Sequence, residues 1–169
     1  MKRIVCLMVT FCLLLLCGCQ NNSNDSYTKP AYFYFPRSDI SIDDQTEVIV
    51  QEVRDGSELK SIEELLQVYL EGPKDNDLYS PFPTEGTILD CKVTGDRIYL
   101  SLSKHYNHMT GLQLTLATSC LTLTLLDCIS GSTTVEIHIS ADDGTVARSY
   151  TLTRDNIILG DHYVALPEE

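Results

Sequence analysis

The sequence is short of basic residues: 12 lysines and arginines stand against 24 aspartates and glutamates, and the formal net charge is −12. An acidic surface repels nucleic acid and anionic headgroups, so this balance argues against a nucleic-acid partner. Solubility, and repulsion from a negatively charged envelope, explain the charge more simply. A strong internal repeat is also lacking, and 169 residues fit a single folded domain.

A disulfide framework is not predicted, although the chain has seven cysteines. Four of them precede residue 20, and the odd number that remains consists of Cys91, Cys120 and Cys128. If Cys120 and Cys128 share a helix, about 12 Å separates them along its axis, whereas a disulfide needs Cα atoms within ~7 Å. We therefore expect buried apolar thiols, with nothing that marks an activated nucleophile.

The N-terminal apolar run, Ile4 to Leu16, is too short to cross a bilayer as a helix, which takes ~20 residues. It follows Lys2 and Arg3, and its length suits the ~7–15-residue core of a secretory signal peptide. We interpret residues 1–18 as such a signal peptide.

The end of this run, Leu16-Cys17-Gly18-Cys19, resembles a lipobox, although Cys17 stands where Ala, Ser or Thr is usual. The resemblance implies cleavage before Cys19 and diacylation of its thiol. Two acyl chains give a stable membrane anchor where one does not. Residues 19–30 are then the lipidated cysteine and a polar, flexible tether, and the protein lies on the extracytoplasmic face of the cell membrane. An ordinary cleaved signal with a chance cysteine is the alternative.

Residues 31–169 are expected to form one α+β domain. Ser61 and Glu64 form a capping box that begins a helix, and Gly72 ends it. One face of this helix is apolar at the spacing i, i+3, i+4 and i+7: Ile62, Leu65, Leu66 and Tyr69. Alternating or β-branched runs predict strands at 32–35, 46–53, 89–93, 98–102, 135–139 and 148–153, with 46–53 alternatively a lead into the helix.

The run from Thr110 to Cys128 is ambiguous. Leucines alternate at 112, 114 and 116, which favours a strand, but the run is far longer than a typical strand. A helix would line one face with Leu112, Leu116, Cys120 and Leu123, and we predict a helix. The element order β–β–α–β–β–α–β–β then predicts a mixed sheet with two helices on one face.

From Glu63 to Ile139 the sequence resembles the GerMN domain of sporulation and spore-germination lipoproteins. Three stretches carry the resemblance: Glu64 to Pro73, Leu78 to Ser103, and Ser119 to Gly144. The stretch 127–133 departs from the family, and the chain has room for one such domain where some members have two. The resemblance implies a fold similar to the ring-building motif of secretion-apparatus proteins. It also implies a non-catalytic role in envelope assembly, sporulation or germination.

Catalytic and metal sites are not predicted, because an enzyme needs a constellation of groups. His105 and His108 are three residues apart, as two metal ligands on a helix could be, but no third ligand is evident nearby. Asp142 and Asp143 suit a hairpin turn better than a calcium site. We accordingly expect no catalytic residue, no metal and no cofactor.

A lipid-anchored scaffold or adaptor is the leading functional hypothesis, binding envelope proteins through a sheet edge or an exposed helix face, with homo-oligomers possible. A cell-wall glycan-binding module is the alternative, because Tyr32, Tyr34 and Tyr99 could stack on sugars if they face outward. An envelope hydrolase that uses His105 or His108 ranks last.

Overall fold

The computed structural model describes residues 30–39 and 48–157. Within them the elements follow the predicted order, with two 3₁₀ helices added. Their bounds are β1 (Ala31–Pro36), β2 (Ile49–Arg54), α2 (Ile62–Leu70), β3 (Ile88–Thr94), β4 (Arg97–Leu102), η1 (Lys104–His108), α3 (Gly111–Cys128), β5 (Thr134–Ser140), β6 (Val146–Thr153) and η2 (Arg154–Asn156).

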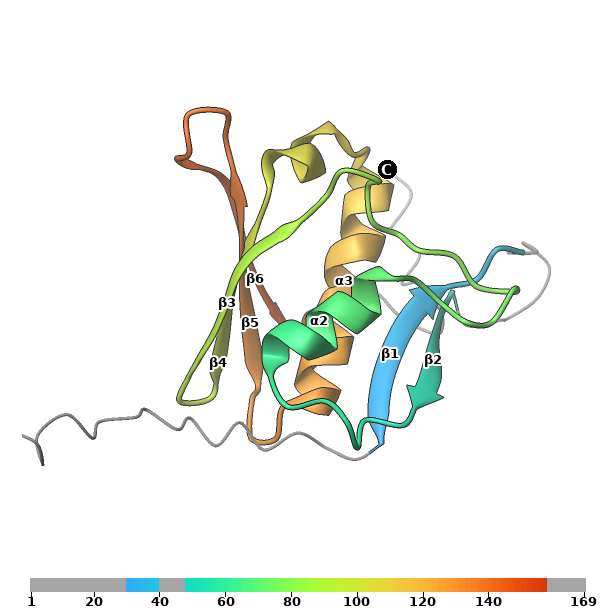
Figure 1. Ribbon diagram of the computed structural model, residues 1–169. Helices are drawn as coiled ribbons and strands as arrows, with labels where there is room; N and C mark the ends of the chain where they lie inside the picture. The colour runs from blue at the N-terminus through green and yellow to red at the C-terminus, as the bar shows by residue number, and fades with distance from the viewer. Residues whose placement is uncertain (1–29, 40–47, 158–169) are drawn as a thin grey trace, which may run out of the picture.

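The described strands form two sheets. Strands β3-β4-β5-β6 make a mixed sheet in which β4 and β5 are parallel, and β1 and β2 make a separate antiparallel pair. Figure 1 shows the two helices between the four-stranded sheet and the β1–β2 pair, so the domain has three layers. The α+β class, the single domain and the mixed sheet with two helices are confirmed. The expected single sheet is instead divided, because β1 and β2 cover the other side of α3.

Helix α2 follows its sequence pattern closely. Ser61 is the N-cap, and its side chain accepts a hydrogen bond from the N–H of Glu64 at 3.2 Å. The helix buries the four predicted residues Ile62, Leu65, Leu66 and Tyr69. Gly72 follows with φ 92°, a conformation that glycine adopts without strain. The capping residue, the apolar stripe and the stop therefore set the limits of this helix.

Helix α3 is buried on all sides over its middle. Every residue from 117 to 125 is buried, and the helix contacts β1 on one side and β5 on the other. The predicted helix is confirmed, but its predicted face is wrong at the amino-terminal end. There Leu114 is buried, whereas Leu112 is 69% exposed, because the first turn of the helix extends past the end of β1, which covers one side of its middle (Figure 1).

Side chains of the helices close one edge of β1. The N–H of Tyr32 donates to Sγ of Cys128 at 3.3 Å, and the N–H of Tyr34 donates to Oγ1 of Thr124 at 3.1 Å. The hydroxyl of Tyr69 donates to the carbonyl of Tyr34 at 2.6 Å. Unpaired strand edges invite pairing with other chains, and here the polar groups are satisfied internally. This explains why β1 packs beside α3 without a further strand.

The predicted strands at 89–93 and 98–102 are confirmed as β3 and β4, which form a hairpin with Gly95 at φ 65° in its turn. A bulge between Ile88 and Asp90 shifts the register, so Ile88 faces the inside and Leu89 is 57% exposed. Counting with a period of two along the predicted strand 89–93 places Leu89 on the inner face with Cys91 and Val93. This placement is wrong for Leu89, because such counting does not detect an inserted residue.

Arg54 joins β2 to the end of α2. Its side chain is 6% exposed, pairs with Glu52, and donates to the carbonyls of Val68 (3.3 Å) and Gly72 (2.7 Å). The guanidinium also lies 4.7 Å from the ring centroid of Phe33. A buried cation at the carboxyl end of a helix is favoured by the helix dipole. Arg54 thus fixes α2 against the β1–β2 pair.

Candidate functional site: a groove at the amino-terminal end of the central helix

The predicted lipidation site lies outside the described residues. The first described residue is Pro30, and it follows Leu16, Cys17, Gly18 and Cys19 in the chain. Cleavage before Cys19 and acylation of its thiol therefore stay predictions from the sequence.

The loop from Leu78 to Thr87 is fixed at both ends. The N–H of Tyr79 donates to the carbonyl of Pro36 at 3.0 Å, and Thr87 and Ser103 bond each other, with the N–H of Thr87 donating to Ser103 Oγ at 3.0 Å. Gly86 donates to the carbonyl of Pro83 at 2.8 Å, and a Cβ at Gly86 would lie 2.5 Å from Cγ of Pro83. A larger residue would therefore clash there, so this glycine is required by the turn itself.

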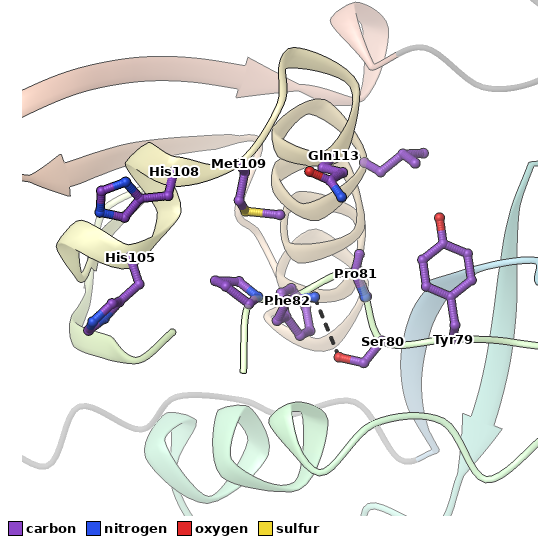
Figure 2. A pocket seen from close by; sticks show the side chains of 10 residues that line it. Tyr79, Ser80, Pro81, Phe82, His105, His108, Met109 and Gln113 are labelled. Carbon is purple, nitrogen blue, oxygen red and sulfur yellow. Dashed lines mark hydrogen bonds between the residues drawn. The ribbon is translucent and has the colours of Figure 1, made fainter. Parts of the chain in front are cut away.

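This loop forms one wall of a groove, and η1 and the first turns of α3 form the other walls. Figure 2 shows His105 and His108 at one end, Met109 and Phe82 in the middle, and Tyr79 at the other end. The remaining lining residues are Ser80, Pro81, Pro83, Gln113 and Leu116. None of the lining residues carries a carboxylate, in a chain whose acidic residues outnumber its basic ones two to one. The groove combines apolar and aromatic surface with two imidazoles.

The two histidines considered as metal ligands lie beside each other at this groove. Nε2 of His105 is 3.4 Å from a carboxylate oxygen of Glu85, and its Nδ1 is 3.4 Å from Oγ of Ser103. Over residues 30–39 and 48–157, no group of three or more potential ligands is arranged to hold a metal ion. Because both ring nitrogens of His105 lie near these partners, His108 is the imidazole that can donate a hydrogen bond to an acceptor in the groove.

Ser103, His105 and Glu85 contact one another in that order, but they are not arranged as a catalytic nucleophile with its base and its orienting carboxylate. Ser103 is buried, and its Oγ already accepts the N–H of Thr87. The 3.4 Å separation from His105 is also longer than the ~2.6–3.2 Å of a nucleophile–base hydrogen bond. Ser103 holds the loop to the end of β4.

The two consecutive aspartates form the turn between β5 and β6, as predicted. Oδ1 of Asp143 accepts the N–H of Thr145 at 3.0 Å and its hydroxyl at 2.7 Å, and Gly144 has φ 82°. Asp142 pairs with Nζ of Lys104 at 2.8 Å. Hydrogen bonds from these partners lower the pKa of both carboxyls. The aspartates therefore stabilise a turn and its contact with η1.

The three described cysteines, Cys91, Cys120 and Cys128, form no disulfide with one another. Cys120 and Cys128 are buried, and Cys91 is half-buried. Burial raises the pKa of Cys128 to about 11 and that of Cys120 further, so both stay protonated at neutral pH. This fits the predicted buried apolar thiols at Cys120 and Cys128.

The three tyrosines of the glycan hypothesis do not share a surface. Tyr99 lies on the outer face of the four-stranded sheet, whereas Tyr32 and Tyr34 lie on β1, beyond α3. The hydroxyl of Tyr34 donates to Asp127, and burial and this contact raise its pKa to about 12. A glycan that stacks on all three rings at once is not supported by this arrangement.

Helix α3 is, among the described residues, long and apolar enough to cross a membrane by length and composition. Most of it is buried inside the domain, where it contacts β1 and β5. Its apolar character is that of a core helix.

A family model named Germane, described as sporulation and spore germination, matches residues 31–146, more than half of the chain. The chain belongs to the Germane family. This confirms the resemblance to GerMN domains seen in the sequence. The match spans both helices, the 78–87 loop and the groove.

Two solved structures are similar to this Germane domain. A presumed lipoprotein from Clostridium perfringens is 20% identical with a TM-score of 0.47, and the match covers 76% of this chain and 87% of that one. The tandem GerMN domains of the sporulation protein GerM from Bacillus subtilis are 18% identical with a TM-score of 0.49, and the match covers 81% of this chain and 49% of that one. This chain thus spans about half of the tandem protein. Curated proteins gave no match.

The groove was missed by reasoning from the sequence. Its residues come from three separate segments, and only the two histidines drew attention there. One sequence feature could have indicated it: of the leucines on the predicted helix face, Leu116 is only partly buried and lines the groove.

Proposed function

We propose that this Germane domain is a lipid-anchored, non-catalytic adaptor on the outer face of the cell membrane, where it brings envelope proteins together during sporulation or spore germination. The observation that carries the proposal is the sequence Leu16-Cys17-Gly18-Cys19 directly after a signal-like apolar run, in a chain of the Germane family. Family membership supports the process, and the N-terminal sequence supports the location.

The tether suits an adaptor. Residues 20–29 are mostly polar and precede the first described strand by one residue. A polar chain of this length has an end-to-end distance of roughly 15–20 Å, so the domain would stay close to the membrane. A protein held there meets other membrane proteins far more often than a free one, because tethering raises the effective concentration.

The outer edge of β3 is the contact surface that we favour. Strand β3 ends the four-stranded sheet, and exposed Leu89 stands on it beside a groove lined by Leu66, Leu70 and Ile88. An extended segment of a partner can pair with such an edge and place an apolar side chain in the adjacent groove.

The anchor is tested by replacing single cysteines and following incorporation of labelled palmitate. Cys19→Ala should abolish the label and either release the protein from the membrane or leave its signal peptide uncut. Cys17→Ala is the matched control, since alanine is usual at this lipobox position, and it should keep the label. Equal labelling of Cys19→Ala and wild type would contradict the anchor.

The contact surface is tested by two substitutions with matched exposure. Leu89 on β3 and Val146 on β6 are each 57% exposed, at opposite edges of the same sheet. In-cell crosslinking of the membrane-bound protein should recover envelope partners from wild type and Val146→Asp, and at least fivefold less from Leu89→Asp. Equal recovery from both variants would exclude the β3 edge, and a crosslink to a second copy alone would replace the adaptor with a homo-oligomer.

A further inference from the structure

The groove and the last described residues lie at opposite ends of α3. The groove includes Gln113 and Leu116 from the first turns of the helix. At the other end Arg154 of η2 pairs with Asp127, and Ile157, the last described residue, is buried. The two ends are ~21 Å apart along the axis, at 1.5 Å per residue.

The sequence after Ile157 can reach this distance. Residues 163–168 follow Ile157 by six to eleven positions, which corresponds to roughly 20–36 Å of extended chain. The chain that follows Ile157 starts near the carboxyl end of α3, and it is long enough to bring these residues to the groove without a change in the described domain.

The chemistry of that segment complements the groove. In an extended chain alternate residues share a side, so Val164, Leu166 and Glu168 would face the same way. Two apolar side chains followed by a carboxylate match a groove whose middle is apolar and whose end carries two histidines. The lining residues carry no carboxylate, and Glu85, which lies beside the groove, is paired with His105, so His108 is the imidazole that can meet the carboxylate of Glu168.

We propose that residues 163–168 occupy this groove in the same chain. Val164 and Leu166 contact Met109, Phe82 and Leu116, and Glu168 accepts a hydrogen bond from His108. Because the segment is covalently attached, its effective concentration at the groove is of millimolar order, and weak contacts suffice to seat it. The segment covers apolar surface that is otherwise open, and the β3 edge stays available to partners. The inference does not depend on the lipid anchor.

The test is site-specific photo-crosslinking in the full chain. p-Benzoylphenylalanine replaces Tyr79, which lines the groove, or Tyr99, which lies on the outer sheet face and serves as the control. Trypsin cleaves after Arg154, and no later lysine or arginine follows, so the segment is recovered in the peptide that begins at Asp155. After irradiation we expect a link between position 79 and this peptide within a single chain, and none from position 99.

Two neighbouring substitutions make the test specific. Leu166→Asp should lower the yield of the link at least fivefold, whereas Ala165→Asp, on the other side of an extended segment, should leave it within twofold. The proposal is overturned if position 79 gives no link, if the link occurs only in a product of two chains, or if both substitutions act equally. Loss of the lipid in Cys19→Ala would leave this result unchanged.

Discussion

The two helices of this domain differ in how much of their surface is buried. Helix α2 buries one stripe of four residues and exposes its other face, whereas α3 is buried on every side between residues 117 and 125. A helix that is buried on one side has an amphipathic sequence pattern. A helix that is covered on two sides is apolar all round, so its sequence lacks that pattern. The difference teaches that a long apolar run without a clear period can indicate a central position.

The threonines of α3 explain why its sequence imitates a strand. Thr122 and Thr124 are both fully buried, so the alternation of leucine and threonine does not separate an inner from an outer face. Oγ1 of Thr118 donates to the carbonyl of Leu114 at 2.9 Å, and Thr124 accepts the N–H of Tyr34. Hydrogen bonds of this kind allow hydroxyls inside a core.

The largest expected loss of stability in a test of this difference between the helices comes from placing a lysine on each helix. Thr122→Lys should cost more than about 4 kcal/mol of unfolding free energy, because an unpaired cation would be buried. Gln67→Lys, on the exposed face of α2, should change it by less than about 0.5 kcal/mol. Both are measured by urea unfolding.

The conservative variant Thr122→Val separates burial of charge from loss of the hydroxyl. Oγ1 of Thr122 has no hydrogen-bond partner within the described part of the chain, so valine should be neutral or slightly stabilising. A tolerated lysine at this position would show that α3 has an open side.

Local features of the fold could be predicted from the sequence, whereas features that depend on distant segments could not. Ser61 and Gly72 delimit α2, and Gly95 marks a hairpin turn, because each acts on its immediate neighbours. The division into two sheets, the bulge at Leu89 and the role of Arg54 depend on which segments meet in space. Of the candidate site, the two histidines were noticed, but the apolar walls around them come from other segments.

Arg54 offers the next largest effect, because it fixes the one-sided helix to the sheet layer. Arg54→Ala should cost about 3–5 kcal/mol, since it leaves Glu52 without its cation and the carbonyls of Val68 and Gly72 without donors. Arg54→Lys keeps the charge but cannot reach all three partners, and an intermediate loss is expected in thermal and urea unfolding. A loss below 1 kcal/mol for the alanine variant would show that packing alone holds α2.

The carboxylate of Glu52 should make this junction sensitive to pH. Burial acts to raise its pKa, but hydrogen bonds from Arg54 and from the N–H groups of Asp75 and Lys74 outweigh burial, so the net pKa lies below its usual value of 4.5. A lowered pKa in the folded state gives stability that is present above pH ~4.5 and lost as the pH falls through the folded pKa. Glu52→Gln should flatten the decline in unfolding free energy between about pH 5 and 3, and an unchanged decline would contradict this role.

The smallest expected loss of stability comes from removing the N-cap side chain, a feature that both helices have, and it tests where the difference in their burial begins. The N-cap Ser61 of α2 accepts the N–H of Glu64 at 3.2 Å, and the N-cap Thr110 of α3 accepts the N–H of Gln113 at 3.4 Å. Capping acts within one turn and near solvent, so Ser61→Ala and Thr110→Ala should each cost about 1 kcal/mol in urea unfolding. A much larger loss at Thr110 would mean that the first turn of α3 is covered as fully as its middle, and the contrast between the helices would then begin at their first residues.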